Sequence, residues 1–562
     1  MDYNILIGGA AGQGVESLAY VLEWVLKRKG FHTFTVRDYM SRVRGGHNFI
    51  QVRFSDREIT SHRDNLDVIL ALNAETVGIH YDRLDTGGLV ICDDDLNYRK
   101  GNLMSFSLKT AAKNAGNVKT MGSAALGVLL KLLGLDLSKV DDVMGRLFKD
   151  DILSQNLTAV EQGFELASPG YDVKTPDTDG NILINGNEAI ALGALAAGCR
   201  FYSAYPMTPS TSIMNYVASK MQEAEVVVEQ AEDEIAAINM AIGASYAGVR
   251  AMTGTSGGGF ALMVEGLGLS GMMEIPLVVA EIQRPGPTTG FPTRTEQGDL
   301  KFVISASQGE FPRMVIAPRS PEDAFYQTVR AFNLADKYRI PVIILGDQYL
   351  ADTTRTTVPF NIDNVEINRY FNHNDFSGDR EYKTYEITDT GVSPRIIPGK
   401  LPGKTVVADS DEHDEYGHIT ESAEMRIIMN EKRMKKLQYL KQELQEPDFL
   451  GDEGADILLV AWGSMYGPIK EALELLNAEG DVRYGALVFG DIWPLPQIQL
   501  EEKARKANAV YNVEQNATGQ LAQLIAEQTG IRCSGSMLKY DGRPLSAQEI
   551  YGRLTKGVER NG

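Results

Sequence analysis

Residues 230–259 read QAEDEIAAINMAIGASYAGVRAMTGTSGGG, and this stretch decides the fold class. Acidic residues precede a predicted helix over 235–247, in which alanine, glycine and serine permit close approach of another backbone. The segment 252–259 is too rich in glycine to continue a strand, so we expect a loop suited to lie against a planar ligand. Acids at a helix start also suit a solvated surface that complements the helix dipole, and this stretch alone leaves that alternative open.

Helix-like and strand-like segments alternate on both sides of this stretch, which is typical of α/β folds. A helix over 186–197 and strands over 275–283 and 341–345 belong to the same predicted domain. A strand over 3–8 and a helix over 15–29 begin an earlier one. The sequence therefore predicts three α/β domains at 1–167, 181–350 and 453–562, a linker over 168–180, and an elaborated connector over 351–452.

The composition is that of an acidic globular protein. Lys and Arg total 55 and Asp and Glu total 75, a formal net charge of −20 that disfavours a nucleic-acid partner. Cys92, Cys199 and Cys533 lie far apart, which disfavours a disulfide scaffold, a zinc ribbon or a self-contained iron-sulfur site. Apolar runs fall short of the ~20 residues of a spanning helix. We therefore expect a cytoplasmic protein without a membrane segment.

Glycine is in excess, with 55 among 562 residues, which predicts tight turns and close helix packing. The loop over 8–14 has the order Gly-x-x-Gly-x-Gly, the reverse of a dinucleotide fingerprint. It favours a turn that packs a helix on a sheet, or amides for an anionic ligand, over a nucleotide site. The acidic segment 409–418 contains two histidines five residues apart, and its loop character favours a solvated connector over a metal site.

Two further segments have the character of ligand-binding turns. Residues 205–211 read YPMTPST, in which Thr208 is predicted to cap a helix with Pro209 at its first position. The two prolines would hold the Thr208 hydroxyl and the helix amides toward an anion. The strand over 275–283 ends at Arg284, ahead of a loop rich in proline and glycine. At the carboxyl end of a strand in an α/β sheet, an arginine can bind a carboxylate or a phosphate.

Together, YPMTPST at 205–211, EDE at 232–234, TGTSGGG at 253–259 and RPGPTTG at 284–290 resemble the α subunit of the 2-oxoacid:ferredoxin oxidoreductases. The loop over 8–14, with Arg44-Gly45-Gly46, resembles the γ domain of that family. The resemblance implies a fused γ-α chain with a γ-type domain, a thiamine pyrimidine-binding domain and a C-terminal transketolase-C-like domain. Met207 and Gly258, where the family more often has isoleucine and proline, remove no functional group.

The family converts a 2-oxoacid and CoA to acyl-CoA and CO2 while it reduces ferredoxin, reversibly in principle. By resemblance, the α subunit holds the aminopyrimidine ring of thiamine diphosphate, and a β subunit holds the diphosphate, magnesium and a [4Fe-4S] cluster. This chain has no G-D-G motif with a following asparagine and no cysteine group, which agrees with that division. We expect an (αβ)2 assembly that is active only with β, and acidic ferredoxin to dock mainly on β.

The resemblance also implies the roles of single residues. Glu234 would contact the aminopyrimidine ring and assist removal of the thiazolium proton, with Thr255, Ser256 and Gly257 also at the cofactor. Thr208 and Arg284 would bind the carboxylate and carbonyl of the substrate. For 2-oxoglutarate, the favoured substrate, Arg294 is the candidate for the distal carboxylate. Pyruvate or a branched-chain 2-oxoacid, a non-catalytic assembly subunit, and a nucleotide-dependent oxidoreductase are the alternatives.

Overall fold

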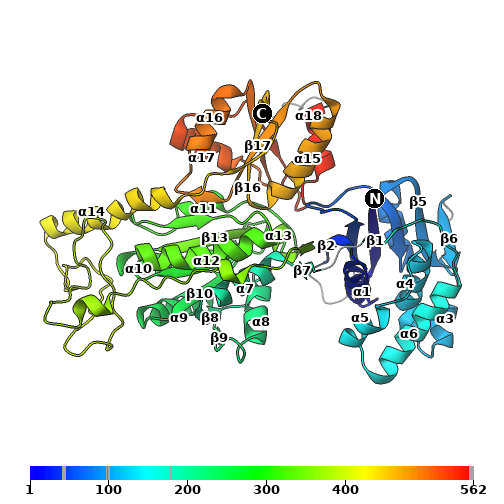
Figure 1. Ribbon diagram of the computed structural model, residues 1–562, viewed down its shortest axis with the longest axis horizontal. Coiled ribbons are helices and arrows are strands. Elements are labelled where there is room, and N and C mark those ends of the chain that lie inside the picture. The colour runs from blue at the N-terminus through cyan, green and yellow to red at the C-terminus, as the bar shows by residue number, and fades with distance from the viewer. Residues whose placement is uncertain (41–45, 97, 99–100, 177–179, 556–562) are drawn as a thin grey trace. The chain divides into compact units, whose positions relative to one another are not determined.

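The computed structural model describes residues 1–562 except 41–45, 97, 99–100, 177–179 and 556–562 (Figure 1). The chain forms two compact units. The N-terminal unit contains Met1–Asn185, Asp352–Pro359 and Ser546–Glu549, and the larger unit contains Gly186–Ala351, Phe360–Leu545 and the residues from Ile550 onward. Arg44 and Gly45 of the predicted γ-type motif lie outside the described residues. The domain boundaries expected from the sequence stay a prediction.

The N-terminal unit is built on an eight-stranded sheet of order β6-β5-β4-β1-β3-β2-β14-β7. Its strands are β1 (Asp2–Ala10), β2 (His32–Asp38), β3 (His47–Ser55), β4 (Leu66–Ala71), β5 (Leu84–Asp93), β6 (Leu103–Phe106), β7 (Ile182–Ile184) and β14 (Thr354–Thr357). Its helices are α1 (Val15–Arg28), α2 (Ala74–His80), α3 (Leu108–Asn114), α4 (Met121–Leu132), α5 (Val140–Leu147) and α6 (Asp150–Glu165). An apolar core forms between α1, α4 and the sheet.

Glycines allow close approach in this unit, as the composition predicts. At Gly127 of α4 a Cβ would collide with the Val160 carbonyl of α6, and at Gly163 of α6 a Cβ would collide with the Ala124 carbonyl. The turn between β1 and α1 is closed by its own side chain, because Gln13 Oε1 accepts a hydrogen bond from the Ala10 N–H at 2.7 Å. The expected turn between strand and helix is therefore present.

The larger unit contains a seven-stranded sheet of order β18-β12-β13-β11-β10-β8-β9. Its strands are β8 (Cys199–Ala204), β9 (Val227–Gln230), β10 (Arg250–Thr255), β11 (Leu277–Gln283), β12 (Met314–Ile316), β13 (Pro341–Asp347) and β18 (Asp491–Trp493). All neighbours are parallel except β12 and β18. Every residue of β10, β11 and β13 is buried, as expected for a parallel sheet covered on both faces.

Helices on the seven-stranded sheet pack in two groups (Figure 1): α7 contacts α8 and α12, while α9 contacts α10. Their bounds are α7 (Gly186–Ala196), α8 (Thr211–Ser219), α9 (Glu234–Tyr246), α10 (Gly257–Met272), α11 (Leu300–Ile304), α12 (Pro321–Tyr338) and α13 (Gln348–Asp352). The sequence-predicted helix over 186–197 is therefore confirmed to within a residue. The helix predicted over 235–247 is likewise confirmed to within a residue as α9, and β9 ends before it at Gln230.

A five-stranded sheet follows in the same unit, in the order β15-β17-β16-β19-β20. Its elements are β15 (Asp448–Gly451), β16 (Ile457–Trp462), β17 (Tyr484–Phe489), β19 (Ala509–Glu514), β20 (Gly535–Leu538), α15 (Tyr466–Glu479), α16 (Ile498–Lys506), α17 (Gln520–Thr529) and α18 (Ala547–Thr555). Trp462 and Phe489 of this sheet share one apolar core with Val279 and Ile343 of the larger sheet. Among the helices that the structure describes, none combines the length and apolar character needed to cross a bilayer.

The segment expected to be a solvated connector is partly buried. His413 is 0% exposed and stacks on Tyr385 with 3.8 Å between ring centroids. Glu412 beside it accepts hydrogen bonds from both terminal nitrogens of Arg433. The solvated-loop prediction for 409–418 is therefore wrong at these residues, because long-range partners neutralise and cover them. The only metal-type cluster of His, Cys, Asp or Glu in the described residues is Asp93-Asp94-Asp95, outside this segment.

Helix α14 (Ala423–Leu440) is fixed to the seven-stranded sheet's unit by buried charges. The Glu274 carboxylate pairs with Lys432 Nζ at 2.6 Å and with Lys436 Nζ at 2.5 Å, and all three side chains are about 1% exposed. Burial, together with the charges of Lys432 and Arg339, lowers the pKa of Lys436 from 10.5 to about 7 against the attraction of Glu274. One carboxylate therefore neutralises two lysines only in part.

Lys436 should make the stability of the folded chain depend on pH. Its pKa is lower in the folded state, so the unfolded chain binds more protons between pH 7 and 10.5, and the free energy of unfolding rises with pH across that window. In Lys436→Met we expect this part of the rise, at most ~1.4 kcal/mol per pH unit, to disappear. Chemical denaturation at several pH values measures it, with exposed Lys441→Met as control. Equal slopes for Lys436→Met and wild type would contradict the assignment.

Candidate active site

Four parallel strands end at one edge of the seven-stranded sheet and place the sequence-predicted residues there. β8 leads into Tyr205, β10 into Ser256, β11 into Arg284 and β13 into Gln348. The edge strand β9, also parallel, leads through three residues to Glu234. Loops at the carboxyl edge of a parallel sheet are the usual ligand-binding position in open α/β folds.

The three acids of the EDE motif have different environments. Glu232 and Asp233 are exposed, and Asp233 caps α9 by accepting a hydrogen bond from the Ala236 N–H at 2.7 Å. Glu234 is the first residue of α9 and is 3% exposed. Its Oε1 atom is buried without a hydrogen-bond partner among the described residues. The alternative of a solvated surface is therefore correct for Glu232 and Asp233 and wrong for Glu234. The buried Glu234 Oε1 is available to a group bound at this site.

The segment 252–259 is not the loop predicted from its glycine content. Residues up to Thr255 continue β10, Ser256 is the N-cap of α10, and the three glycines form the first turn of that helix. Gly257 lies against the Asp299 carboxylate and Gly259 against Glu234, where a Cβ would collide with each side chain. The glycines therefore serve close approach within a helix, not irregular backbone.

Ser256 and Thr255 are both 0% exposed. The Ser256 hydroxyl has no hydrogen-bond partner among the described residues, and the Thr255 hydroxyl donates only a long bond of 3.4 Å to the Ser256 carbonyl. Three predicted cofactor contacts, Thr255, Ser256 and Gly257, are consecutive at the start of α10, and Gly259 of the same turn lies against Glu234 of α9. Their role at the cofactor stays a prediction, and the loop expected for them was wrong.

The structure brings Thr208 and Arg284 together. Arg284 Nη1 donates a hydrogen bond to the Thr208 carbonyl at 2.7 Å, across 76 residues of sequence. Arg284 Nε is buried without a partner among the described residues, and burial lowers the pKa of the guanidinium, which stays ionised. Thr208 is not the predicted N-cap, because α8 begins at Thr211 after Ser210. The turn 208–210 precedes the helix, so its carbonyl is available to hold Arg284.

Arg294 lies in the loop that follows Arg284. Its side chain is 9% exposed, its N–H donates to the Phe291 carbonyl at 3.1 Å, and Gly542 packs against its Cβ. The glycine at 542 makes that contact possible, since a Cβ there would come within 3.2 Å of Arg294. A residue from the C-terminal part of the same unit therefore packs against Arg294. The sequence alone could not show this contact.

Buried acids near this edge were missed by the sequence analysis. Glu281 stands in the middle of β11 and is 0% exposed, and Asp347 at the end of β13 is 2% exposed. Asp299 precedes α11 and touches Gly257. An acid inside the apolar run LVVAEIQ was the available signal, because carboxylates are rarely placed in a fully buried strand without purpose.

These residues fit the aminopyrimidine end of thiamine. A neutral heteroaromatic ring with a basic nitrogen needs a carboxyl partner and close backbone approach, and Glu234 Oε1 and the glycine turn of α10 offer both. A diphosphate needs basic side chains or a bound magnesium ion, and in the described residues no metal-type cluster of acids lies at this helix start. The chain's own residues thus suit one end of the coenzyme.

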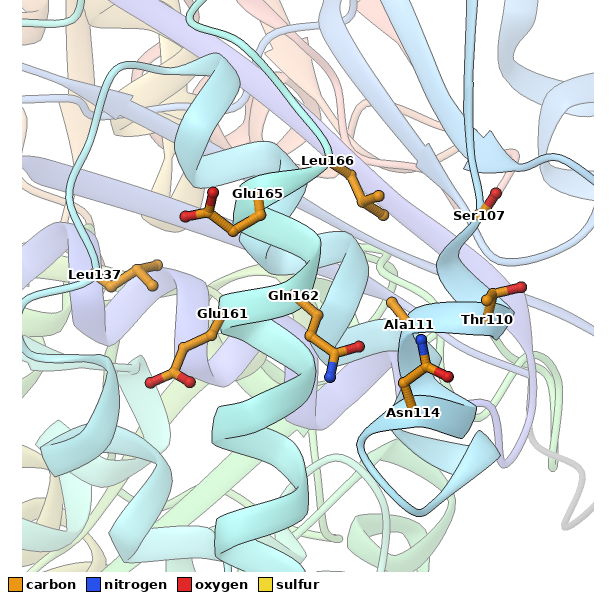
Figure 2. Close-up of a pocket in the computed structure, with 9 residues that line it drawn as sticks. All are labelled: Ser107, Thr110, Ala111, Asn114, Leu137, Glu161, Gln162, Glu165 and Leu166. Carbon is orange, nitrogen blue, oxygen red and sulfur yellow. The ribbon is translucent and has the colours of Figure 1, made fainter.

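A hollow of about 540 Å³ in the N-terminal unit is unrelated to this site (Figure 2). It lies between α3 and α6, with Glu161 and Glu165 in its wall, and none of its nine lining residues is Lys or Arg. Such a lining does not suit an anionic coenzyme. None of the sequence-predicted site residues lies in it.

Comparisons with known proteins find three family models that match the chain. The thiamine diphosphate-binding model of pyruvate flavodoxin/ferredoxin oxidoreductase matches residues 192–432. The model of pyruvate ferredoxin/flavodoxin oxidoreductase matches residues 4–166, and that of pyruvate:ferredoxin oxidoreductase core domain II matches residues 455–550. Together the matches extend over most of the chain.

Individual relatives are similar along the chain. The 2-oxoacid:ferredoxin oxidoreductase subunit alpha of Sulfolobus sp is 32% identical, over 100% of this chain and 97% of that relative. The 2-oxoglutarate oxidoreductase subunit KorA of Mycobacterium tuberculosis is 30% identical, over 91% and 84% respectively.

A solved structure is similar over 99% of both chains, with a TM-score of 0.92 and 31% identity. It is the 2-oxoglutarate:ferredoxin oxidoreductase from Magnetococcus marinus with 2-oxoglutarate, coenzyme A and succinyl-CoA bound. The α/β fold class predicted from the sequence is confirmed. On this evidence the chain belongs to the family of thiamine-diphosphate-dependent 2-oxoacid:ferredoxin oxidoreductase α subunits.

Proposed function

We propose that this chain is the γ-α fused subunit of a 2-oxoglutarate:ferredoxin oxidoreductase and that Glu234 is its catalytic acid-base group. The observation that supports this most is the buried, unpartnered Glu234 oxygen at the start of α9, opposite the glycine turn of α10. When bound, thiamine supplies the carbon nucleophile that attacks a 2-oxoacid. Glu234 holds and exchanges a proton at the far ring nitrogen, and Ser256 and Thr255 lie at the start of α10, whose glycine turn faces Glu234.

Thr208 and Arg284 bind the substrate in this proposal. The Arg284 guanidinium has a buried Nε without a partner among the described residues, and a carboxylate can accept from Nε and a terminal nitrogen together. The hydrogen bond from Nη1 to the Thr208 carbonyl fixes the guanidinium plane. Arg284 then orients the 2-oxoacid carboxylate, and the adjacent Thr208 hydroxyl is placed to contact the carbonyl. The product of the forward reaction is an acyl-CoA.

For the substrate we favour 2-oxoglutarate over pyruvate or a branched-chain 2-oxoacid. The similar structure has 2-oxoglutarate and succinyl-CoA bound, and the relative from Mycobacterium tuberculosis is named a 2-oxoglutarate oxidoreductase. The distal carboxylate of 2-oxoglutarate needs a cation, and Arg294 is the residue we assign to it. The same site without that contact would accept shorter 2-oxoacids.

A β subunit completes the enzyme in this proposal. The three cysteines form no metal-type cluster in the described part of the chain, and burial raises the pKa of Cys199 to about 12 and of Cys533 to about 11. A [4Fe-4S] cluster needs four cysteine thiolates brought together, so we place the cluster on the β subunit, with magnesium and the diphosphate. Ferredoxin docks mainly on β, the assembly is (αβ)2, and the enzyme is cytoplasmic.

Glu234→Gln tests the central assignment. The amide keeps the shape but cannot exchange a proton, so we expect turnover in the complex with β to fall by at least ~100-fold. Dye reduction with CoA and 2-oxoglutarate measures turnover, and co-purification measures association, which should persist. Glu501→Gln, an exposed glutamate of α16, is the matched control. Turnover near wild type in Glu234→Gln would refute the proposed function.

Arg284→Lys tests substrate binding. Lysine keeps the charge but loses the planar fork, so we expect KM for the 2-oxoacid to rise about tenfold or more, equivalent to ~1.4 kcal/mol. KM for CoA should change little. Steady-state kinetics with both substrates separate the two, and exposed Arg505→Lys is the control. An unchanged KM for the 2-oxoacid would remove Arg284 from the substrate site.

Arg294→Met tests substrate choice. Loss of the cation should reduce kcat/KM for 2-oxoglutarate by ~10-fold or more relative to pyruvate, since a buried carboxylate without a partner is costly. Competition between the two 2-oxoacids measures the ratio. An unchanged ratio in a variant that keeps its thermal stability would assign the distal contact elsewhere.

A further inference from the structure

Glu281 is a buried acid whose carboxyl oxygens accept no hydrogen bond from an N–H or O–H group of the described residues. It occupies the middle of β11, opposite Thr255 of β10 and Leu345 of β13, and is 0% exposed. Both of its oxygens are buried, and neither accepts a hydrogen bond from a backbone or side-chain donor. An ionised carboxylate in that position would forfeit its hydration without replacement, so the side chain is neutral.

Asp299 is the group that meets Glu281. Asp299 is held beside Gln283, two residues from Glu281 on the same face of β11, and its carboxyl raises the pKa of Glu281. Ionised carboxylates only accept hydrogen bonds, so a hydrogen bond between the two requires a proton on one of them. Asp299 is the more exposed of the pair, and its backbone N–H donates to Gln283 Oε1 at 2.9 Å, which fixes the residue beside β11. The proton therefore resides on Glu281.

The other titratable groups that affect this pair are also acids. Burial, then the charges of Asp299 and Asp347, raise the pKa of Glu281 well above its ordinary value. Burial raises the pKa of Asp299 to about 6, and burial with Asp299 raises that of Glu296 to about 7. Asp347 itself accepts hydrogen bonds from the Leu350 N–H and the Ser464 hydroxyl. No cation is among the groups responsible for these shifts.

The Asp299 carboxylate reaches the coenzyme site through α10. It lies where a Cβ of residue 257 would stand, at the first residue of the 16-residue helix. Two residues further along the same turn, Gly259 lies against Glu234. A negative carboxylate at a helix start is favoured by the helix dipole, so Asp299 holds that turn electrostatically. The turn lies between the Asp299 and Glu234 carboxyl groups.

We propose that Glu281 and Asp299 share one proton and act as a positioning pair for the coenzyme site. The Glu281 O–H donates to Asp299, and Asp299 fixes the glycine turn that faces Glu234. The inference rests on the proposed function, in which that turn contacts the coenzyme. Neither residue touches substrate, and the shared proton stays on the pair during turnover.

Two substitutions at residue 281 separate this role from general acid-base chemistry. In Glu281→Gln the amide N–H replaces the O–H, so turnover in the complex with β should remain within about threefold of wild type. In Glu281→Leu the donor is absent, so the apparent KM for thiamine diphosphate should rise and turnover should fall at least tenfold. The KM for the 2-oxoacid should change less than the KM for thiamine diphosphate. Equal loss in both variants would overturn the proposal.

The proton itself can be detected without turnover. The purified full chain at neutral pH should show the infrared C=O absorption of a protonated carboxylic acid, and Glu281→Gln should lose it. Exposed Glu501→Gln should not. Absence of any difference would overturn the shared proton, and this readout decides the case if Glu281→Leu does not fold. The infrared measurement needs no coenzyme. An active Glu234→Gln variant would therefore refute the proposed function, whereas an unchanged infrared spectrum in Glu281→Gln would refute this inference.

Discussion

The site depends on the parallel pairing of β8, β10, β11 and β13. Their common direction places the segments after each strand at one edge, and the register opposes Thr255, Glu281 and Leu345. Side chains alternate between sheet faces, so a slip by one residue would move Glu281 to the other face and separate it from Asp299. The buried and mostly apolar side chains of these strands, packed on helices, stabilise the register that the chemistry requires.

Much of this arrangement is predictable from sequence, and the errors have physical causes. The strands over 275–283 and 341–345 are predictable because buried parallel strands read as apolar runs. The segment 252–259 was mistaken for a loop because glycine usually opposes regular structure. Here Gly257 and Gly259 begin a helix, where glycine is tolerated, and the need for them comes from Asp299 and Glu234 against the backbone. Contacts between segments distant in sequence decide such positions, and a single sequence does not record them.

The connector shows the same limit in another form. Lys432 and Arg395, within the connector, are each buried in an ion pair with a residue far along the chain, Lys432 with Glu274. Arg395, for example, pairs with Asp336 at 2.8 Å. Hydropathy alone cannot separate a solvated charge from a paired one, because the difference lies in the partner. His413 was predicted to be solvated because the sequence does not show that it stacks on Tyr385.

The distribution of charge bears on which end of thiamine diphosphate the residues of this chain suit. Glu234, Glu281, Asp299 and Asp347 lie at or near the carboxyl edge of the same sheet, and the first two are buried without cationic partners among the described residues. In a poorly hydrated site such a group of acids repels a diphosphate and favours a ring nitrogen that can share a proton. The acids at this edge therefore suit the aminopyrimidine end of the coenzyme, which is the assignment on which the proposed function rests.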